Sequence, residues 1–142
     1  MSTAPVPVAT LTLAPTALSM RDIGPWLQES TRDLEPRTAQ ALLSRMELAV
    51  HEACMNVVDH AQLDGGERIE LALTVSPTAV TVRVRDSGTA FDPGLVPAPA
   101  AGQLQERGYG VKIVRSLVDG LGYRRVDGHN ELTLRIDLET AR

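Results

Sequence analysis

The sequence predicts an α+β fold, a two-layer sandwich with about three helices on one face of a mixed, mostly antiparallel sheet. Two patterns support this prediction. One is a long segment whose apolar residues recur every three or four positions, and the other is a set of segments in which apolar and polar residues alternate. Aromatic residues make up only 3% of the chain, so we expect a core of Leu, Val, Ile and Ala.

The helix predicted over residues 37–61 has the broadest apolar face in the sequence. Pro36 suits its first turn, where a missing backbone N–H costs nothing. A face this wide indicates burial against a sheet or another helix. Its apolar residues are Leu42, Met46, Ala49, Ala53 and Val57, with Leu43, Val50, Cys54, Val58 and Ala61 beside them.

Two shorter helices are predicted over residues 17–33 and 111–121. Gly24 and Pro25 are expected to break or kink the first of them. Between the strands and the last helix, residues 86–110 hold most of the glycine and proline of the chain. A loop of this length in a small domain is usually functional or mobile.

Five segments show strand character, and residues 8–13 are expected to form an edge strand. Two central segments are expected to pair as an antiparallel hairpin with one buried face. Asp127-Gly128 separates the last two and is a strong hairpin signal. We expect a single domain over residues 1–142 in which residues 1–7 are disordered. The other four strand segments are 69–75, 80–85, 122–126 and 131–138.

Composition and charge exclude several classes of protein. The net charge is −4, which argues against a broad basic surface for direct nucleic-acid binding. Cys54 is the only cysteine, so no internal disulfide can form. The sequence lacks a signal-peptide pattern and any apolar run of about 18 residues, so we expect no membrane contact and a cytoplasmic location.

Glu52, Asn56 and His60 are spaced four residues apart on the long predicted helix. They form a polar stripe along otherwise apolar surface, because each step of four residues turns the helix by only about 40°. An Asn oxygen and a neighbouring carboxylate can share a hydrated divalent cation, and the carboxylate can also accept a proton. The stripe is equally compatible with a solvated helix face in which Glu52 pairs with an arginine.

A second polar segment begins with Asp86 and Gly88, where a strand of alternating valines ends. An aspartate in this position can accept a hydrogen bond from an exocyclic amine such as that of adenine. Glycine lets the backbone approach a flat ring closely. The competing interpretation is an ordinary turn, because Asp, Ser and Gly are all turn formers.

A third segment places Gly108 and Gly110 at the start of a predicted helix, with Arg107 directly before them. Free N–H groups at a helix start can bind phosphate oxygens, and Arg107 is placed to reach a terminal phosphate. The spacing matches neither a Walker loop nor a dinucleotide-binding fingerprint. Each segment alone is weakly diagnostic, but the order of the three is specific.

This ordered set resembles the N, G1 and G2 boxes of the GHKL ATPase superfamily, and most closely the anti-sigma-factor serine/threonine kinases of partner-switching systems. The resemblance covers residues 8–138 and implies the Bergerat-type ATP-binding fold, with ATP and Mg²⁺ as cofactors. It implies that Asn56 ligates Mg²⁺ and that Glu52 acts as general base or positions the attacking hydroxyl. Asp86 and Gly88 would bind adenine. Gly108, Gly110 and Arg107 would face the phosphates, residues 94–107 would form an ATP lid, and His60 matches the family pattern without an assigned role.

The implied activity is phosphorylation of a STAS-type anti-sigma antagonist combined with sequestration of a sigma factor, by a domain that forms a homodimer. The predicted lid is short and rich in Pro and Ala, which departs from the family pattern. A second hypothesis is therefore a nucleotide-regulated binding module that titrates a partner without kinase activity. A third is that the three segments coincide by chance in an unrelated two-layer domain.

Overall fold

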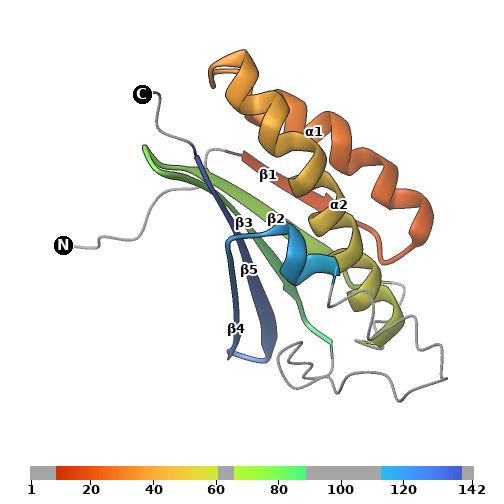
Figure 1. Cartoon of the computed structure of the whole chain (residues 1–142). Coiled ribbons are helices and arrows are strands. Elements are labelled where there is room, and N and C mark those ends of the chain that lie inside the picture. The colour runs from red at the N-terminus through yellow and green to blue at the C-terminus, as the bar shows by residue number, and fades with distance from the viewer. Residues whose placement is uncertain (1–8, 61–65, 89–112, 139–142) are drawn as a thin grey trace, which may run out of the picture.

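A five-stranded sheet forms one layer of the protein, and helices cover one of its faces (Figure 1). The computed structural model describes residues 9–60, 66–88 and 113–138. Within them, the elements are β1 (Ala9–Leu13), the 3₁₀ helix η1 (Ala17–Asp22), α1 (Ile23–Ser30), α2 (Pro36–His60), β2 (Ile69–Val75), β3 (Ala79–Asp86), β4 (Gly120–Val126) and β5 (His129–Asp137). Residues 113–117 form a further short helix. These elements confirm the predicted α+β two-layer fold.

The strands follow the order β1-β2-β3-β5-β4, and every pairing among them is antiparallel. The mostly antiparallel sheet of the prediction thus has no parallel pair among the described strands. The edge position predicted for the first strand is confirmed. Because β5 lies between β3 and β4, side chains of β5 can contact both of these strands.

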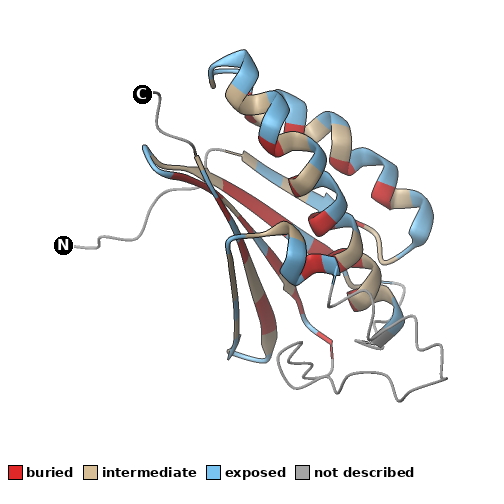
Figure 2. Cartoon of the chain, in the orientation of Figure 1, coloured by how far each residue is buried: buried red, intermediate tan, exposed pale blue. Residues whose placement is uncertain are grey.

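The core lies between the sheet and α2. Strand alternation turns one set of side chains of β2, β3 and β5 toward the helices, and most of them are buried, while Val75 and Leu132 are partly buried. Figure 2 shows the buried positions in red, on the strands of the sheet and on the helices that cover it. From α2 the core receives Met46, Ala49, Val50, Ala53 and Cys54, and from the strands Leu71, Leu73, Val82, Val84, Leu134 and Ile136.

The start of α2 is fixed by a local cap. The Glu35 carboxylate accepts hydrogen bonds from the backbone N–H of Thr38 at 2.9 Å and from its hydroxyl at 3.1 Å. Hydrogen bonds from the backbone of Arg37 and Thr38 lower the pKa of Glu35 below its ordinary value. Pro36 occupies the first helical position, as predicted. This side-chain cap satisfies N–H groups that have no partner inside the helix.

The two shorter helices differ from their predicted bounds. The segment over 17–33 divides into η1 and α1 at Ile23, next to Gly24 and Pro25 as the glycine and proline predict. The helix predicted over 111–121 ends at residue 117 in the structure, and β4 already begins at Gly120. Arg45 of α2 explains this early end, because its Nε donates to the carbonyl of Leu117 at 3.0 Å.

The β4–β5 hairpin turns at Asp127 and Gly128, as predicted. Both residues have positive φ angles, 52° and 78°, which is the conformation that two-residue hairpin turns require. Both strands begin two residues earlier than predicted, β4 at Gly120 and β5 at His129, and β5 ends at Asp137, one residue before the predicted bound. Among the described helices, none has both the length and the apolar character needed to cross a lipid bilayer.

Candidate functional site

Asp86 is the last residue of β3 and only 4% of its surface is exposed. Its Oδ1 accepts a hydrogen bond from the backbone N–H of Gly88 at 2.8 Å and another from Asn130 Nδ2 at 3.0 Å. Asp86 and Asn130 are direct partners in the register of β3 and β5. No hydrogen bond from the described residues reaches the second oxygen, Oδ2, so one side of a buried carboxylate stays available as an acceptor.

The side-chain amide of Asn130 is itself held in one orientation. Its Oδ1 accepts from the Tyr123 hydroxyl at 2.6 Å and from Arg125 Nη1 at 3.1 Å. Both donors lie on β4, next to Asn130 across the hairpin. Because the oxygen receives two donors, the amide nitrogen must face Asp86, which needs a donor.

Arg125 also connects the hairpin to the turn that follows β3. Its Nη1 donates to the carbonyl of Gly88 at 2.9 Å, and its Nη2 donates to the carbonyl of Gly128 at 3.3 Å. Gly88 is buried at this contact. A guanidinium group presents several donors in a rigid plane, so one side chain can hold several acceptors in fixed relative positions.

The long helix lies against the same carboxylate. Burial raises the pKa of the Cys54 thiol to about 12, and the negative charge of Asp86 contributes to the increase. Cys54 is fully buried, which confirms its predicted place in the core. Cys54 shares the buried core with Val84, which lies two residues before Asp86 on the same face of β3, so this part of α2 packs on the end of β3.

Glu52 and Asn56 lie on the flank of α2, between its buried and its exposed face, and both are half-buried. Neither has a hydrogen bond or an ion pair to another described residue, so Glu52 is not engaged with an arginine there. His60 is the last residue of α2, but its side chain lies outside the described residues. Arg107, Gly108, Gly110, the lid segment 94–107 and residues 1–7 also lie outside them.

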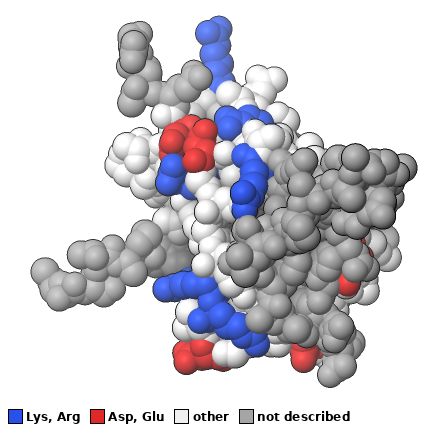
Figure 3. Space-filling view, turned by 60° about the horizontal axis from the view of Figure 1, so that its bottom comes forward, with Lys and Arg blue, Asp and Glu red and all other residues white. Residues whose placement is uncertain are grey.

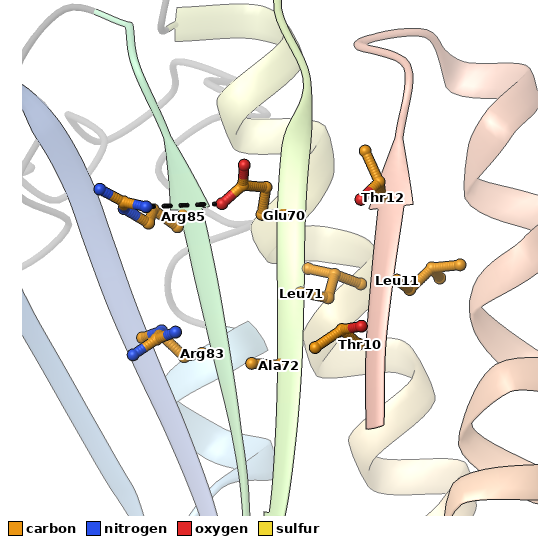
Figure 4. A pocket seen from close by; sticks show the side chains of 8 residues that line it. All are labelled: Thr10, Leu11, Thr12, Glu70, Leu71, Ala72, Arg83 and Arg85. Carbon is orange, nitrogen blue, oxygen red and sulfur yellow. Dashed lines mark ion pairs between the residues drawn. The ribbon is translucent and has the colours of Figure 1, made fainter. Parts of the chain in front are cut away.

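A shallow pocket of about 240 Å³ lies on the other face of the sheet (Figure 4). It is lined by residues of β1, β2 and β3, and an ion pair of 3.5 Å joins Arg85 to Glu70 across it. Arg85 and Asp86 are consecutive in β3, so their side chains point to opposite faces. The pocket therefore does not belong to the Asp86 site.

Charged side chains are mixed over the end of the molecule that comes forward in Figure 3. Lys and Arg side chains gather in separate groups with Asp and Glu among them, and they form no continuous positive band on its described part. The described residues also contain no group of three or more His, Cys, Asp or Glu side chains placed to hold a metal ion.

A model of the histidine kinase-like ATPase domain matches residues 12–136 of the sequence. The chain belongs to this family. Membership implies that the domain binds ATP, and it confirms the superfamily identified from the three motifs. The curated protein named serine/threonine-protein kinase BtrW, from Bordetella bronchiseptica, is 32% identical over 130 residues, which cover 88% of this chain and 90% of that protein. This match confirms the serine/threonine-kinase branch of the family.

Solved structures of the histidine kinase-like ATPase family share the fold. The structure of the RsbU and RsbW domains of Rv1364c from Mycobacterium tuberculosis aligns over 98% of this chain with a TM-score of 0.63 at 20% identity. This chain spans only 35% of that protein chain. The histidine kinase domain of a blue-light activated kinase from Erythrobacter litoralis aligns over 82% of this chain and 61% of its own, with a TM-score of 0.52 at 19% identity. At these identities the likeness concerns the fold alone.

Sequence reasoning identified Asp86 and Gly88, which the structure brings together, but it missed three residues that hold them. Tyr123, Arg125 and Asn130 belong to the hairpin predicted at its Asp-Gly turn. The sequence predicted the turn of this hairpin. It did not predict the contact between Asn130 and Asp86, because that contact depends on the pairing of β5 with β3.

Proposed function

We propose that this domain is an ATP-dependent protein serine/threonine kinase. In this proposal it transfers the γ-phosphoryl group of ATP to a serine or threonine of a STAS-type anti-sigma antagonist in the cytoplasm and sequesters a sigma factor. Family membership supports the ATP site, and the similarity to the serine/threonine-protein kinase of Bordetella bronchiseptica supports the class of reaction. The observation that carries the proposal is the buried Asp86 carboxylate with one available oxygen.

Asp86 is suited to recognise adenine. An exocyclic amine that donates to Oδ2 would add a hydrogen bond to a charged group whose residue is only 4% exposed, where few water molecules compete for the oxygen. A base with a carbonyl at the same position would place two acceptors against each other. Gly88, whose N–H and carbonyl are both held, would line the base pocket without a side chain in the way.

The residues on α2 fit a magnesium ion that is held mainly by nucleotide phosphates. Mg²⁺ prefers oxygen ligands and is usually bound through one or two protein groups together with substrate phosphates and water. Asn56 would supply its side-chain oxygen as a ligand, and the half-buried Glu52 would orient or deprotonate the attacking hydroxyl. The ion itself would offset the charge of the transferring phosphoryl group. Gly108, Gly110 and Arg107 would contact the phosphates.

The partners in this proposal are those of the anti-sigma-factor kinases that the three motifs resemble. The Mycobacterium tuberculosis protein combines an RsbW domain with an RsbU domain in one chain, whereas the Bordetella bronchiseptica kinase has nearly the length of this chain. We assign the antagonist as the phosphorylated substrate and the sigma factor as the protein held when the antagonist is phosphorylated. The active form in this proposal is a homodimer.

Isothermal titration calorimetry of Mg-ATP tests the site. Asp86→Asn replaces the available oxygen by an amide and should weaken binding by about 10- to 100-fold, since one buried hydrogen bond to a charged group contributes about 1.5–3 kcal/mol. Asn56→Ala should weaken binding of Mg-ATP more than that of ATP with the metal chelated. Glu131→Gln is the matched control, because Glu131 is equally buried on the opposite face.

Phosphoryl transfer is measured separately with radiolabelled ATP and a STAS-domain substrate. Glu52→Ala should abolish transfer while it leaves the affinity for Mg-ATP unchanged. Absence of Mg-ATP binding by the wild-type protein would refute the proposal. Binding without transfer by the wild type would favour the nucleotide-regulated binding module.

A further inference from the structure

We propose that Arg125 and Asn130 are positioning residues that set the Asp86 carboxylate for recognition of an amino-bearing base. This inference rests on the proposed function and deepens it. The two residues lie on the β4–β5 hairpin, far in sequence from Asp86, and the sheet order brings them to it. They control which oxygen of Asp86 faces a ligand.

The Asp86 carboxylate is held in one orientation. Asn130 and the backbone N–H of Gly88 both donate to Oδ1 of Asp86 and none of the described residues donates to Oδ2. Two donors on one oxygen fix the rotation of the carboxylate about its Cβ–Cγ bond. The other oxygen is then left in a defined place, ready for one further donor.

Asn130 is held by two side chains of β4. The side-chain amide of Asn130 has two orientations that differ by a flip. Only one of them directs the amide nitrogen toward Asp86, whereas the other would place an amide oxygen against the carboxylate. Tyr123 and Arg125 both donate to Asn130 Oδ1 and so favour the productive state. A hydrogen bond from a guanidinium group is stronger than one from a neutral donor, which gives Arg125 the larger share of this effect.

The turn after β3 is held by Arg125. Arg125 donates to the carbonyl of Gly88, the residue whose N–H holds Asp86 from the other side. The same side chain therefore fixes both donors of Asp86, one through Asn130 and one through Gly88. Its loss would release the carboxylate from two sides.

The chain supplies a matched control in the neighbouring residue. Arg124 precedes Arg125 on β4, but its side chain points to the opposite face of the sheet, where its Nε donates to Glu131 at 2.8 Å. Arg124→Ala removes the same charge from the same strand without touching the Asp86 network. Its side chain is 69% exposed, so its loss leaves no cavity, but Glu131 loses a hydrogen-bond donor and a moderate decrease in the free energy of unfolding is expected.

The experiment compares two nucleotides that differ only in the amine. Affinities of Arg125→Ala, Asn130→Ala and Arg124→Ala are measured by calorimetry for Mg-ATP and for the magnesium complex of purine riboside triphosphate, which lacks the exocyclic amine. Arg125→Ala and Asn130→Ala should weaken Mg-ATP binding by about 10-fold and change binding of the analogue by less than about 2-fold. Arg124→Ala should leave both affinities unchanged.

A merely structural role of the network would lower both affinities equally, and that result would overturn the inference. Unchanged Mg-ATP binding by both variants would also overturn it. If either variant fails to fold, Tyr123→Phe removes a single hydroxyl from the network and should lower the affinity for Mg-ATP alone. In an Asp86→Asn background, Arg125→Ala should cause no further loss, because the group that it positions has already been changed.

The failure of this inference is distinguishable from that of the proposed function. A wild-type protein that does not bind Mg-ATP refutes both. A wild-type protein whose binding depends on Asp86, while Arg125→Ala binds as the wild type does, refutes the positioning role alone.

Discussion

Asn130 and Glu131 are neighbours in β5, and both are almost fully buried, yet they belong to opposite faces of the sheet. Each connects β5 to the strands on its two sides. Asn130 contacts Asp86 of β3 and the side chains of β4 on the face covered by α2. Glu131 lies between Arg124 and Arg85 on the open face, at 2.8 Å and 3.6 Å from their Nε atoms.

The difference lies in how the carboxylate oxygens are paired. On the open face, each carboxylate oxygen of Glu131 has its own arginine, with a hydrogen bond from Arg124 and a longer ion pair with Arg85, whose Nε has no hydrogen-bond partner. On the helix-covered face, the described donors converge on one oxygen of Asp86 and leave the other open. The same three strands thus carry an ion-pair cluster on one face and, on the other, the carboxylate that we propose as a binding site.

The largest expected effect is a loss in the free energy of unfolding, and it distinguishes the packed face of the sheet from the open one. Leu134→Ala removes a fully buried side chain from the helix-covered face and should lower the free energy of unfolding by about 2–5 kcal/mol. Thr133→Ala, one residue earlier and on the open face, should change it by less than about 0.5 kcal/mol. Urea denaturation measures both. Equal losses would mean that the open face is also covered in solution.

Removal of Glu131 tests whether its cluster is structural only. Glu131→Ala leaves two arginines without their shared partner and should lower the free energy of unfolding by about 1–3 kcal/mol. The affinity for Mg-ATP should stay within about 2-fold of the wild type. Glu70→Ala is the control, because Glu70 pairs with Arg85 from an exposed position and should cost less than about 1 kcal/mol. A large loss of nucleotide affinity in Glu131→Ala would contradict the separation of the two faces.

The buried thiol beside Asp86 gives a pH-dependent test. The pKa of Cys54 is raised from its ordinary 9.0 to about 12, so the folded state favours the neutral thiol. This stabilisation is fully present below pH 9 and is lost as the pH rises toward 12. Between pH 8 and pH 10, the free energy of unfolding of the wild type should fall by about 1.4 kcal/mol more than that of Cys54→Ala.

The same titration sharpens the comparison of the faces. Neither Asp86→Asn nor Glu131→Gln should change this extra loss, because burial, the larger cause, keeps the folded-state pKa of Cys54 above this pH range in both variants. Chemical denaturation at each pH measures the loss. Equal slopes for the wild type and Cys54→Ala would show that the thiol is not buried.

The smallest effect concerns the turn that both clusters share. Gly128 has a φ of 78°, and no atom lies within 4 Å of where a Cβ would be, so Gly128→Ala introduces backbone strain without a clash. The expected cost is about 1 kcal/mol in the free energy of unfolding. Gly66→Ala, in open space as well but without a positive φ, is the control. Thermal unfolding monitored by circular dichroism compares the two.

Local pattern determined most of the elements. The bounds predicted for the strand 69–75 agree with the structure, and the helix predicted over 37–61 is observed as Pro36–His60. Periodicity succeeds here because each element buries one face, and the spacing of apolar residues records it. The third helix was predicted too long, because its end depends on Arg45, a residue 72 positions away from the carbonyl that it binds.

The sequence alone also predicted a site at the end of β3 with Asp86 and Gly88. That prediction came from the order of the three polar segments, since an aspartate and a glycine after a strand can also form an ordinary turn. The tertiary structure alone decided that Asn130 lies opposite Asp86 and that Arg125 reaches Gly88. The physical reason is the sheet order β1-β2-β3-β5-β4, since pairing between strands distant in the chain depends on the burial of whole faces and leaves no local signal.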